Sequence, residues 1–540
     1  MTKSATHVAI YDTTLRDGAQ SEDVLFSVED KLRIVERLDA LGVDFVEGGW
    51  PGANPKDGAF FQQVKKLPLG HCRISAFGST ARPGNPMAED PVLEALVRAE
   101  TGVVTLFGKS WTLHVTKALG ISLAQNLELI YESVRYLKRH VDTVIYDAEH
   151  FFDGFKADGD YALQTLKAAH EGGAACLVLC DTNGGTLVSE IGRITARAAA
   201  VGGPLGIHCH NDSGLAVANS LMAVEAGVVQ VQGTINGLGE RCGNADLTSV
   251  IPNLCLKMPG VVTSLDGDRL KELMATSRFV NEMANRSSQK NQPFVGASAF
   301  AHKGGIHVSA VLKDSATYEH IQPGLVGNRQ RVLVSEQSGR SNLFYKLQAF
   351  GITDLTQTDP RIQALLEQVK EAEHRGYQFD GADASFELMA RKALGQLPDY
   401  FSLRGFRVID QRRVEEDGRR VVFSDASVKV AVGQLQEHTA AEGNGPLNAL
   451  DQALRKALAR FYPNLWEVEL DDFKVRIISG GGTAAQVRVL IESQDARDRW
   501  GTVGMSDNIV VAAYEALVDS LVYKLFKDGS VPPAAPPDNG

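Results

Sequence analysis

Two histidines separated by a single residue are the sharpest chemical signal in this sequence. His208 and His210 stand in the segment HCHND (208–212), at the end of a short apolar run. Alternate side chains of a strand share one face, so both imidazoles can reach one ion while Cys209 points away. Neutral imidazole is a common metal ligand. The pattern alone fits a hydrogen-bonded or rim pair equally well, and the position at the end of a strand favours the metal site.

Oxygen donors that could complete such a site lie in two other segments. Arg16 and Asp17 belong to DTTLRDGAQ (12–20), and Asn244 belongs to GLGERCGNAD (237–246). Asp17 and Asn244 can each give an oxygen to an ion, and Arg16 can stabilise a developing oxyanion. Taken singly, a loop Arg–Asp pair is more often a surface ion pair, and an Asn is often a cap or turn residue. Together they favour metal-assisted chemistry on an oxygen-rich substrate over a non-haem iron oxygenase.

Further candidates follow other strand-like runs. Glu149 could transfer protons, and Thr182 could donate a hydrogen bond to a substrate carboxylate. Both side chains could equally cap the next turn. Phe107, Lys109 and Tyr146 are candidates for shaping a pocket, or for ordinary packing.

An alternation of short apolar runs and amphipathic segments predicts how these residues are positioned. Helical periodicity covers 28–42, 123–140 and 187–202. Eight repeats in about 250 residues predict a (β/α)8 TIM barrel, whose sites lie at the carboxyl ends of the strands. A doubly wound sheet is the alternative, but the first turn has no glycine-rich dinucleotide loop. The eight predicted strands are 7–12, 43–49, 72–78, 103–108, 143–149, 176–182, 204–210 and 228–234.

The rest of the chain has a different pattern. We expect the barrel at 1–265, helical subdomains at 266–385, an α+β domain at 386–528 and a disordered tail at 529–540. The α+β part has an internal duplication in which strands precede one helix, which makes a regulatory or dimerising role plausible. Its predicted strands are 400–410, 424–433, 473–479 and 485–493, and its predicted helices are 445–458 and 506–525.

Composition restricts the class of protein. A net charge of -11 and a pI near 5.7 argue against broad nucleic-acid or anionic-membrane surfaces. Six cysteines without a C-x-x-C pair suit a reducing cytoplasm. The first predicted strand starts at residue 7, so we expect no signal peptide, and no apolar run approaches the ~20 residues that cross a bilayer.

Taken jointly, DTTLRDGAQ, HCHND and GLGERCGNAD resemble the acyl-CoA-condensing metalloenzymes of the homocitrate, 2-isopropylmalate and citramalate synthase family. The resemblance extends from about residue 5 to 527. It implies a divalent ion (Mn, Mg or Zn) bound by Asp17, His208, His210 and Asn244. It also implies a catalytic Arg16 and, at Glu149 and Thr182, groups that handle substrate.

Two segments outside the predicted barrel carry further resemblance. FAHKGGIH (300–307) and TYEHIQP (317–323) are similar to family segments with a catalytic His and Tyr, which correspond to His307 and Tyr318. In the family these residues reach the neighbouring subunit, which implies a homodimer. The C-terminal duplication resembles the leucine- or isoleucine-sensing domain.

The choice of substrate rests on three segments, 46–57, 107–115 and 146–156, which look closest to the citramalate-forming members. This implies condensation of acetyl-CoA with pyruvate and inhibition by isoleucine. Phe107 and Tyr146 could narrow the pocket, and since one methylene discriminates by only about 1–3 kcal/mol, some reaction with 2-oxobutyrate is expected. The alternatives are a 2-isopropylmalate synthase and a non-catalytic amino-acid-sensing barrel.

Overall fold

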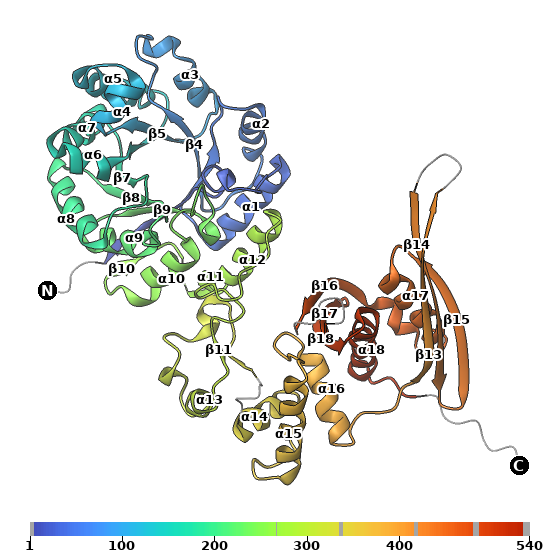
Figure 1. The fold of residues 1–540 in the computed structure, drawn as a ribbon. Coiled ribbons are helices and arrows are strands. Elements are labelled where there is room, and N and C mark those ends of the chain that lie inside the picture. The colour runs from blue at the N-terminus through green and yellow to red at the C-terminus, as the bar shows by residue number, and fades with distance from the viewer. Residues whose placement is uncertain (1–4, 266, 334–338, 415–419, 479–484, 533–540) are drawn as a thin grey trace, which may run out of the picture. The chain divides into compact units, whose positions relative to one another are not determined.

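The computed structural model describes residues 5–265, 267–333, 339–414, 420–478 and 485–532 (Figure 1). They form two compact units, one of Met1–Phe300 with Glu319–Gln330, the other of Ala301–Tyr318 with Arg331–Gly540. The domain boundaries expected from the sequence stay a prediction. Residues 533–540 of the expected tail lie outside the described residues. No described helix is both long and apolar enough to span a membrane.

Eight parallel strands of the first unit close into a barrel in chain order. The barrel closes because β2 (Ala9–Asp12) pairs with both β3 (Phe45–Gly49) and β9 (Gln230–Gly233). The predicted TIM barrel is therefore confirmed. The strands between them are β4 (Arg73–Ser79), β5 (Val103–Lys109), β6 (Thr143–Glu149), β7 (Cys176–Asp181) and β8 (Leu205–Cys209).

Helices surround the strands as an outer ring (Figure 1). The first, α1 (Val28–Leu41), begins at a capping box in which Ser27 Oγ accepts from Asp30 N and the Asp30 carboxylate accepts from Ser27 N. It ends at Gly42, whose φ of 94° suits glycine. The other helices of the ring are α2 (Pro55–Val64), α3 (Pro91–Arg98), α5 (Leu123–Leu137), α6 (Phe151–Ala157), α7 (Gly159–Gly172), α8 (Val188–Ala198), α9 (Ala216–Glu225) and α10 (Leu247–Lys257).

The second unit contains helices followed by two copies of a three-stranded antiparallel sheet with one helix. The leading helices are α13 (Gly305–Val311), α14 (Arg340–Ala349), α15 (Pro360–His374) and α16 (Asp383–Ala393). The first copy consists of β13 (Ser402–Val414), β14 (Arg420–Val432), β15 (Leu435–Gly443) and α17 (Pro446–Leu458). The second consists of β16 (Glu469–Ile477), β17 (Val487–Gln494), β18 (Arg499–Ser506) and α18 (Ile509–Lys527).

The duplication predicted from the sequence is present, but each copy has one strand more than expected. β15 was missed because its residues, LQEHTAAEG, are mostly polar and largely exposed. β18 was missed because two glycines interrupt its apolar pattern. Both helices share one core with both sheets, in which Leu454 and Leu521 are fully buried.

Candidate active site

A cavity of about 260 Å³ opens at the carboxyl ends of the barrel strands. This is the end at which TIM-barrel enzymes place their active sites. Every lining residue belongs to the first unit, and most of the residues predicted for the site are among them. The residues that line the cavity are Arg16, Asp17, Gln20, Trp50, Phe77, Phe107, Asp147, Glu149, Cys180, Thr182, His208, His210, Glu240 and Arg241.

Three buried side chains converge on one side of the cavity. The Nε2 atoms of His208 and His210 lie 3.2 and 3.8 Å from Asp17 Oδ2, and 3.4 Å from each other. One ligand atom from each residue falls within 4.8 Å of the others. Two imidazole nitrogens with one carboxylate oxygen form a donor set that suits a divalent cation. We call these three residues the metal-ligand cluster.

The amide of Asn244 gives an independent indication that a cation fits here. Asn244 forms a backbone bridge with His210. Its Nδ2 donates to the Leu238 carbonyl at 3.1 Å. Its Oδ1 is buried and has no hydrogen-bond partner among the described residues. A buried acceptor without a partner is costly, and an ion beside it would remove that cost.

Hydrogen bonds behind the cluster orient its ligands. His208 Nδ1 lies 3.0 Å from Gln232 Oε1, which only accepts, so Nδ1 carries a hydrogen and Nε2 is the ring nitrogen that faces the cluster. Gln232 in turn donates from Nε2 to Asp147 Oδ1 at 3.0 Å. Sequence reasoning missed Gln232 and Asp147, and their only signal is a polar residue inside an apolar strand.

Burial and charge give the ligands different protonation states. Burial raises the pKa of Asp17, but Arg16 and the hydrogen bond from His208 outweigh it and hold that pKa well below its usual range. Burial and the neighbouring His208 lower the pKa of His210 to about 4. Burial lowers the pKa of His208, but the hydrogen bond and charge of Asp17 outweigh that effect and raise it. Asp17 and His210 are therefore ready to bind a cation at neutral pH.

Arg16 is fixed from two sides. Its Nε donates to Glu47 Oε2 at 2.6 Å, and its guanidinium carbon lies 3.8 Å from the centroid of the Phe77 ring. Glu47 is fully buried and also accepts from Tyr11 Oη at 2.8 Å. Burial lowers the pKa of Arg16, but the charges of Glu47 and Asp17 outweigh that effect and raise the pKa above its usual value. The guanidinium therefore stays charged. Glu47 was missed from the sequence, where its one signal is an acidic residue in a strand.

Glu149 and Thr182 both line the cavity, as their strand-end positions predicted. Glu149 Oε2 accepts from the Lys109 ammonium. Thr182 Oγ1 accepts from the backbone N–H of His150 at 2.9 Å. Because that bond uses a lone pair, the Thr182 hydroxyl hydrogen is free to donate to a bound carboxylate.

The two aromatic residues predicted to narrow the pocket lie in different places. Phe107 lines the cavity. Tyr146 is fully buried in the core between strands and helices, and the neighbouring Asp147 occupies the inward position on β6. Alternation along β6 explains this, since Glu149 and Asp147 share one face and Tyr146 has the other. The cavity instead contains Trp50 and Phe77, which sequence reasoning missed.

His307 and Tyr318 belong to the second unit, where the structure brings them together. Their rings stack with centroids 4.3 Å apart and planes inclined by 29°. Tyr318 is 46% exposed. Neither residue lines the barrel cavity.

Comparison with known proteins agrees with the barrel and with the order of the domains. Residues 7–280 match the HMGL-like family model, residues 294–376 the homocitrate synthase post-HMGL domain-like model, and residues 380–525 the LeuA allosteric (dimerisation) domain model. By its barrel and the order of its domains, the chain is an HMGL-like protein whose C-terminal part matches the LeuA-type domain.

Curated relatives narrow this class. The (R)-citramalate synthase of Geobacter sulfurreducens is 56% identical, over 97% of this chain and 98% of that protein. The enzyme of the same name from Aquifex aeolicus is 54% identical, over 97% of this chain and 99% of that protein. A probable 2-isopropylmalate synthase of Methanopyrus kandleri is 33% identical, over 95% of this chain and 97% of that protein. The chain belongs to the (R)-citramalate synthase family, which confirms the family predicted from the sequence.

Proposed function

We propose that the chain condenses acetyl-CoA with pyruvate to give (R)-citramalate and CoA, a step in isoleucine biosynthesis. The observation that carries the proposal is the metal-ligand cluster in a small barrel cavity of about 260 Å³. The relatives named (R)-citramalate synthase, at 44–56% identity, support the choice of substrates.

Asp17, His208 and His210 would hold a divalent ion, with Asn244 as a further ligand. The imidazole nitrogens suit Zn²⁺ and the oxygen donors suit Mg²⁺ and Mn²⁺, so each of these three ions finds matching ligands here. When bound, the ion supplies a Lewis acid for the keto group of the 2-oxo acid.

Arg16 and Thr182 handle the substrate oxygens. Glu47 occupies Nε of Arg16, so the remaining N–H groups of this cavity-lining guanidinium can stabilise the alkoxide that forms on the keto carbon. The free hydroxyl hydrogen of Thr182 donates to the carboxylate of pyruvate.

Two candidates could remove a proton from the acetyl methyl group. The first is His307 of the partner subunit, whose ring is oriented by stacking on Tyr318. The second is Glu149, which lines the cavity while Lys109 holds one of its oxygens. The resulting enolate adds to the keto carbon, and hydrolysis of the thioester then releases citramalate and CoA.

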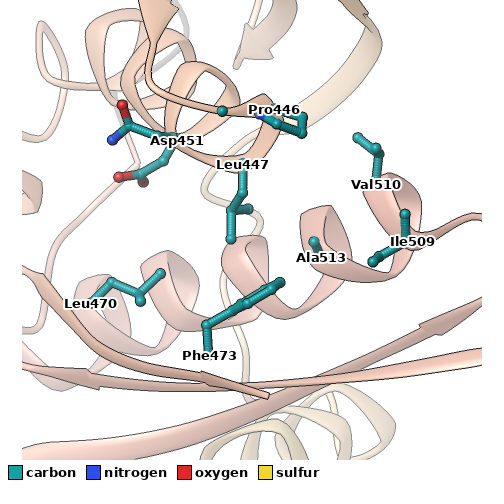
Figure 2. A pocket seen from close by; sticks show the side chains of 10 residues that line it. Pro446, Leu447, Asp451, Leu470, Phe473, Ile509, Val510 and Ala513 are labelled. Atoms are coloured by element: carbon teal, nitrogen blue, oxygen red, sulfur yellow. The ribbon is translucent and has the colours of Figure 1, made fainter. Parts of the chain in front are cut away.

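The LeuA-type domain supports feedback inhibition by isoleucine and homodimerisation. A cavity of about 540 Å³ lies where α17 and α18 begin (Figure 2). Leu447 from α17 and Phe473 from β16 extend into it, and Asp451 gives it one carboxylate (Figure 2). An amino acid with an apolar side chain fits this combination, with its ammonium at Asp451 and its carboxylate at the free N–H groups of a helix start.

We place the enzyme in the cytoplasm and expect neither nucleic acid nor membrane as a partner. The net charge of -11 and the free cysteines support this.

Thiol release with acetyl-CoA and a panel of 2-oxo acids tests the proposal. Release that is fastest with pyruvate, stops with a chelator and returns with added Mn²⁺ is the expected result. A preference for 2-oxoisovalerate would indicate 2-isopropylmalate synthase activity instead. If none of the 2-oxo acids gave CoA release, the non-catalytic amino-acid-sensing barrel would be favoured.

A further inference from the structure

Three aromatic rings form one side of the barrel cavity. Trp50 follows β3, and Phe77 and Phe107 lie near the carboxyl ends of the adjacent strands β4 and β5. Phe77 and Phe107 stack at 5.2 Å between centroids with planes at 19°. Trp50 meets both edge-on, at 6.0 and 5.7 Å. We call these three residues the aromatic wall.

The wall faces the metal-ligand cluster. In the closed barrel, β4 and β8 are separated by the same number of strands in either direction, so Phe77 on β4 lies across from His208 on β8. A 2-oxo acid whose oxygens point toward the cluster and Thr182 therefore directs its carbon substituent toward the wall. Arg16 packs on Phe77, so these rings adjoin the reacting end of the substrate.

Trp50 reaches the cavity because β3 ends in an irregularity. The pairing of β3 with β4 shifts between Glu47 and Gly49. In a regular strand, residues 47 and 50 would face opposite sides. Here Glu47 bonds to Arg16 inside the barrel, and Trp50 also lines the cavity. A bulge that redirects one side chain beside an active site has this effect.

A buried ion pair holds the backbone of Trp50 from behind. Asp57 Oδ2 accepts from Trp50 N at 3.0 Å, and Asp57 Oδ1 accepts from Lys31 Nζ at 2.6 Å. Lys31 also donates to the Gly48 carbonyl at 2.9 Å. Lys31 and Asp57 are 2% and 6% exposed. Gly49 has φ +141°, and a Cβ there would lie 2.6 Å from the Asp57 carboxyl carbon, so this close approach of the backbone to Asp57 requires glycine.

We propose that Trp50 determines the specificity of the condensation for the 2-oxo acid, because its ring limits the length of the carbon substituent that the cavity accepts. Lys31 and Asp57 are positioning residues that fix the ring. This inference rests on the proposed function and deepens it, since it names the part of the site that separates pyruvate from larger 2-oxo acids.

The test compares Trp50→Leu with the parent. We would measure kcat/KM for pyruvate, 2-oxobutyrate and 2-oxoisovalerate by thiol release at saturating acetyl-CoA. The preference for pyruvate over 2-oxoisovalerate should fall by about tenfold or more, since one methylene is worth about 10- to 200-fold in a fitted pocket. The KM for acetyl-CoA should stay unchanged, and Trp50→Phe should be intermediate. Trp466→Leu, at a 58% exposed tryptophan of the second unit, is the matched control.

Asp57→Asn tests the positioning role with little change of shape. The selectivity ratio should move in the same direction as in Trp50→Leu, with unchanged metal content and little further effect in the double variant. A merely structural role would lower kcat for all acids without altering the ratio. Should Asp57→Asn not fold, Phe77→Leu tests the wall from the next strand.

The outcomes separate the two proposals. An unchanged ratio in Trp50→Leu, with the parent active on pyruvate, would overturn the inference alone. A parent that releases CoA with none of the acids would overturn the proposed function.

Discussion

Two aspartates beside arginines, one in each unit, show how the two cavities differ. Asp17 Oδ2 lies 3.4 Å from Arg16 Nη1, and Asp451 Oδ1 accepts from Arg455 Nε at 2.7 Å. The pKa of Asp17 is held low against burial by Arg16 and His208. Burial raises the pKa of Asp451, and Arg455 offsets that effect only in part.

The difference lies in how many partners stabilise the carboxylate. Asp17 has two imidazoles besides its arginine. Arg455 divides its N–H groups between Asp451 and the carbonyls of Leu465 and Val468. The barrel cavity is therefore a site of fixed charge, suited to a cation and to chemistry. The cavity beside α17 and α18 is mainly apolar. A ligand ammonium would be bound there by pairing with the carboxylate of Asp451.

The largest effect is expected from a change in the cluster. Asp17→Asn removes the anionic ligand, so the bound ion should be lost and kcat/KM should fall by about 10³-fold or more, since metal assistance is worth several kcal/mol. Elemental analysis and thiol release check both. Full metal content with near-parental turnover would contradict the assignment of Asp17, and Asp23→Asn, at an exposed carboxylate, is the control.

Arg16→Ala should lower kcat/KM by about 10²- to 10³-fold, the scale of one lost oxyanion donor. The metal content should be retained, since Arg16 is not a ligand. Arg16→Lys should recover part of the loss. Turnover of Arg16→Ala within a few-fold of the parent would rule out the proposed role.

Gln232→Met removes the acceptor of the His208 Nδ1 hydrogen and leaves Asp147 without its donor. Outer hydrogen bonds of this kind change metal affinity by about 10- to 100-fold. Competition with a metal-sensitive dye measures this without turnover. An affinity equal to that of the parent would show that the relay does not orient the ligand.

The smallest effect is expected at the other cavity. Asp451→Asn should weaken inhibition by isoleucine by about tenfold, the value of one charge-assisted hydrogen bond, and leave the uninhibited rate unchanged. A carboxylate binds an ammonium only when ionised, so inhibition of the parent should weaken as pH falls through the raised pKa of Asp451. The variant should lose that dependence. Inhibition curves at several pH values distinguish these outcomes.

The barrel could be predicted because parallel strands covered on both faces are short, nearly continuous apolar runs. The positions of Asp17, His208 and His210 followed from the same rule, since each ends or follows such a strand. β15 could not be found this way, because its polar residues lie on an exposed sheet.

The aromatic residues near the cavity show where prediction from strand alternation fails. Tyr146 was expected in the pocket, although regular alternation from Glu149 places it on the outer face, where it lies. Trp50 breaks the same rule in the opposite sense, because the pairing shift after Glu47 turns it inward. The periodicity of the sequence does not reveal a β-bulge, so the position of Trp50 in the cavity could be found only from the structure.

Closure of the barrel between its first and last strands has a consequence for synthesis of the chain. Asp17 follows β2, His208 and His210 come from β8 and its end, and Asn244 follows β9. A nascent chain therefore carries the first ligand long before the others emerge from the ribosome. The ion can bind all of its ligands only in a completed barrel. Metal binding is therefore a late step, which follows closure of the barrel and stabilises the closed state.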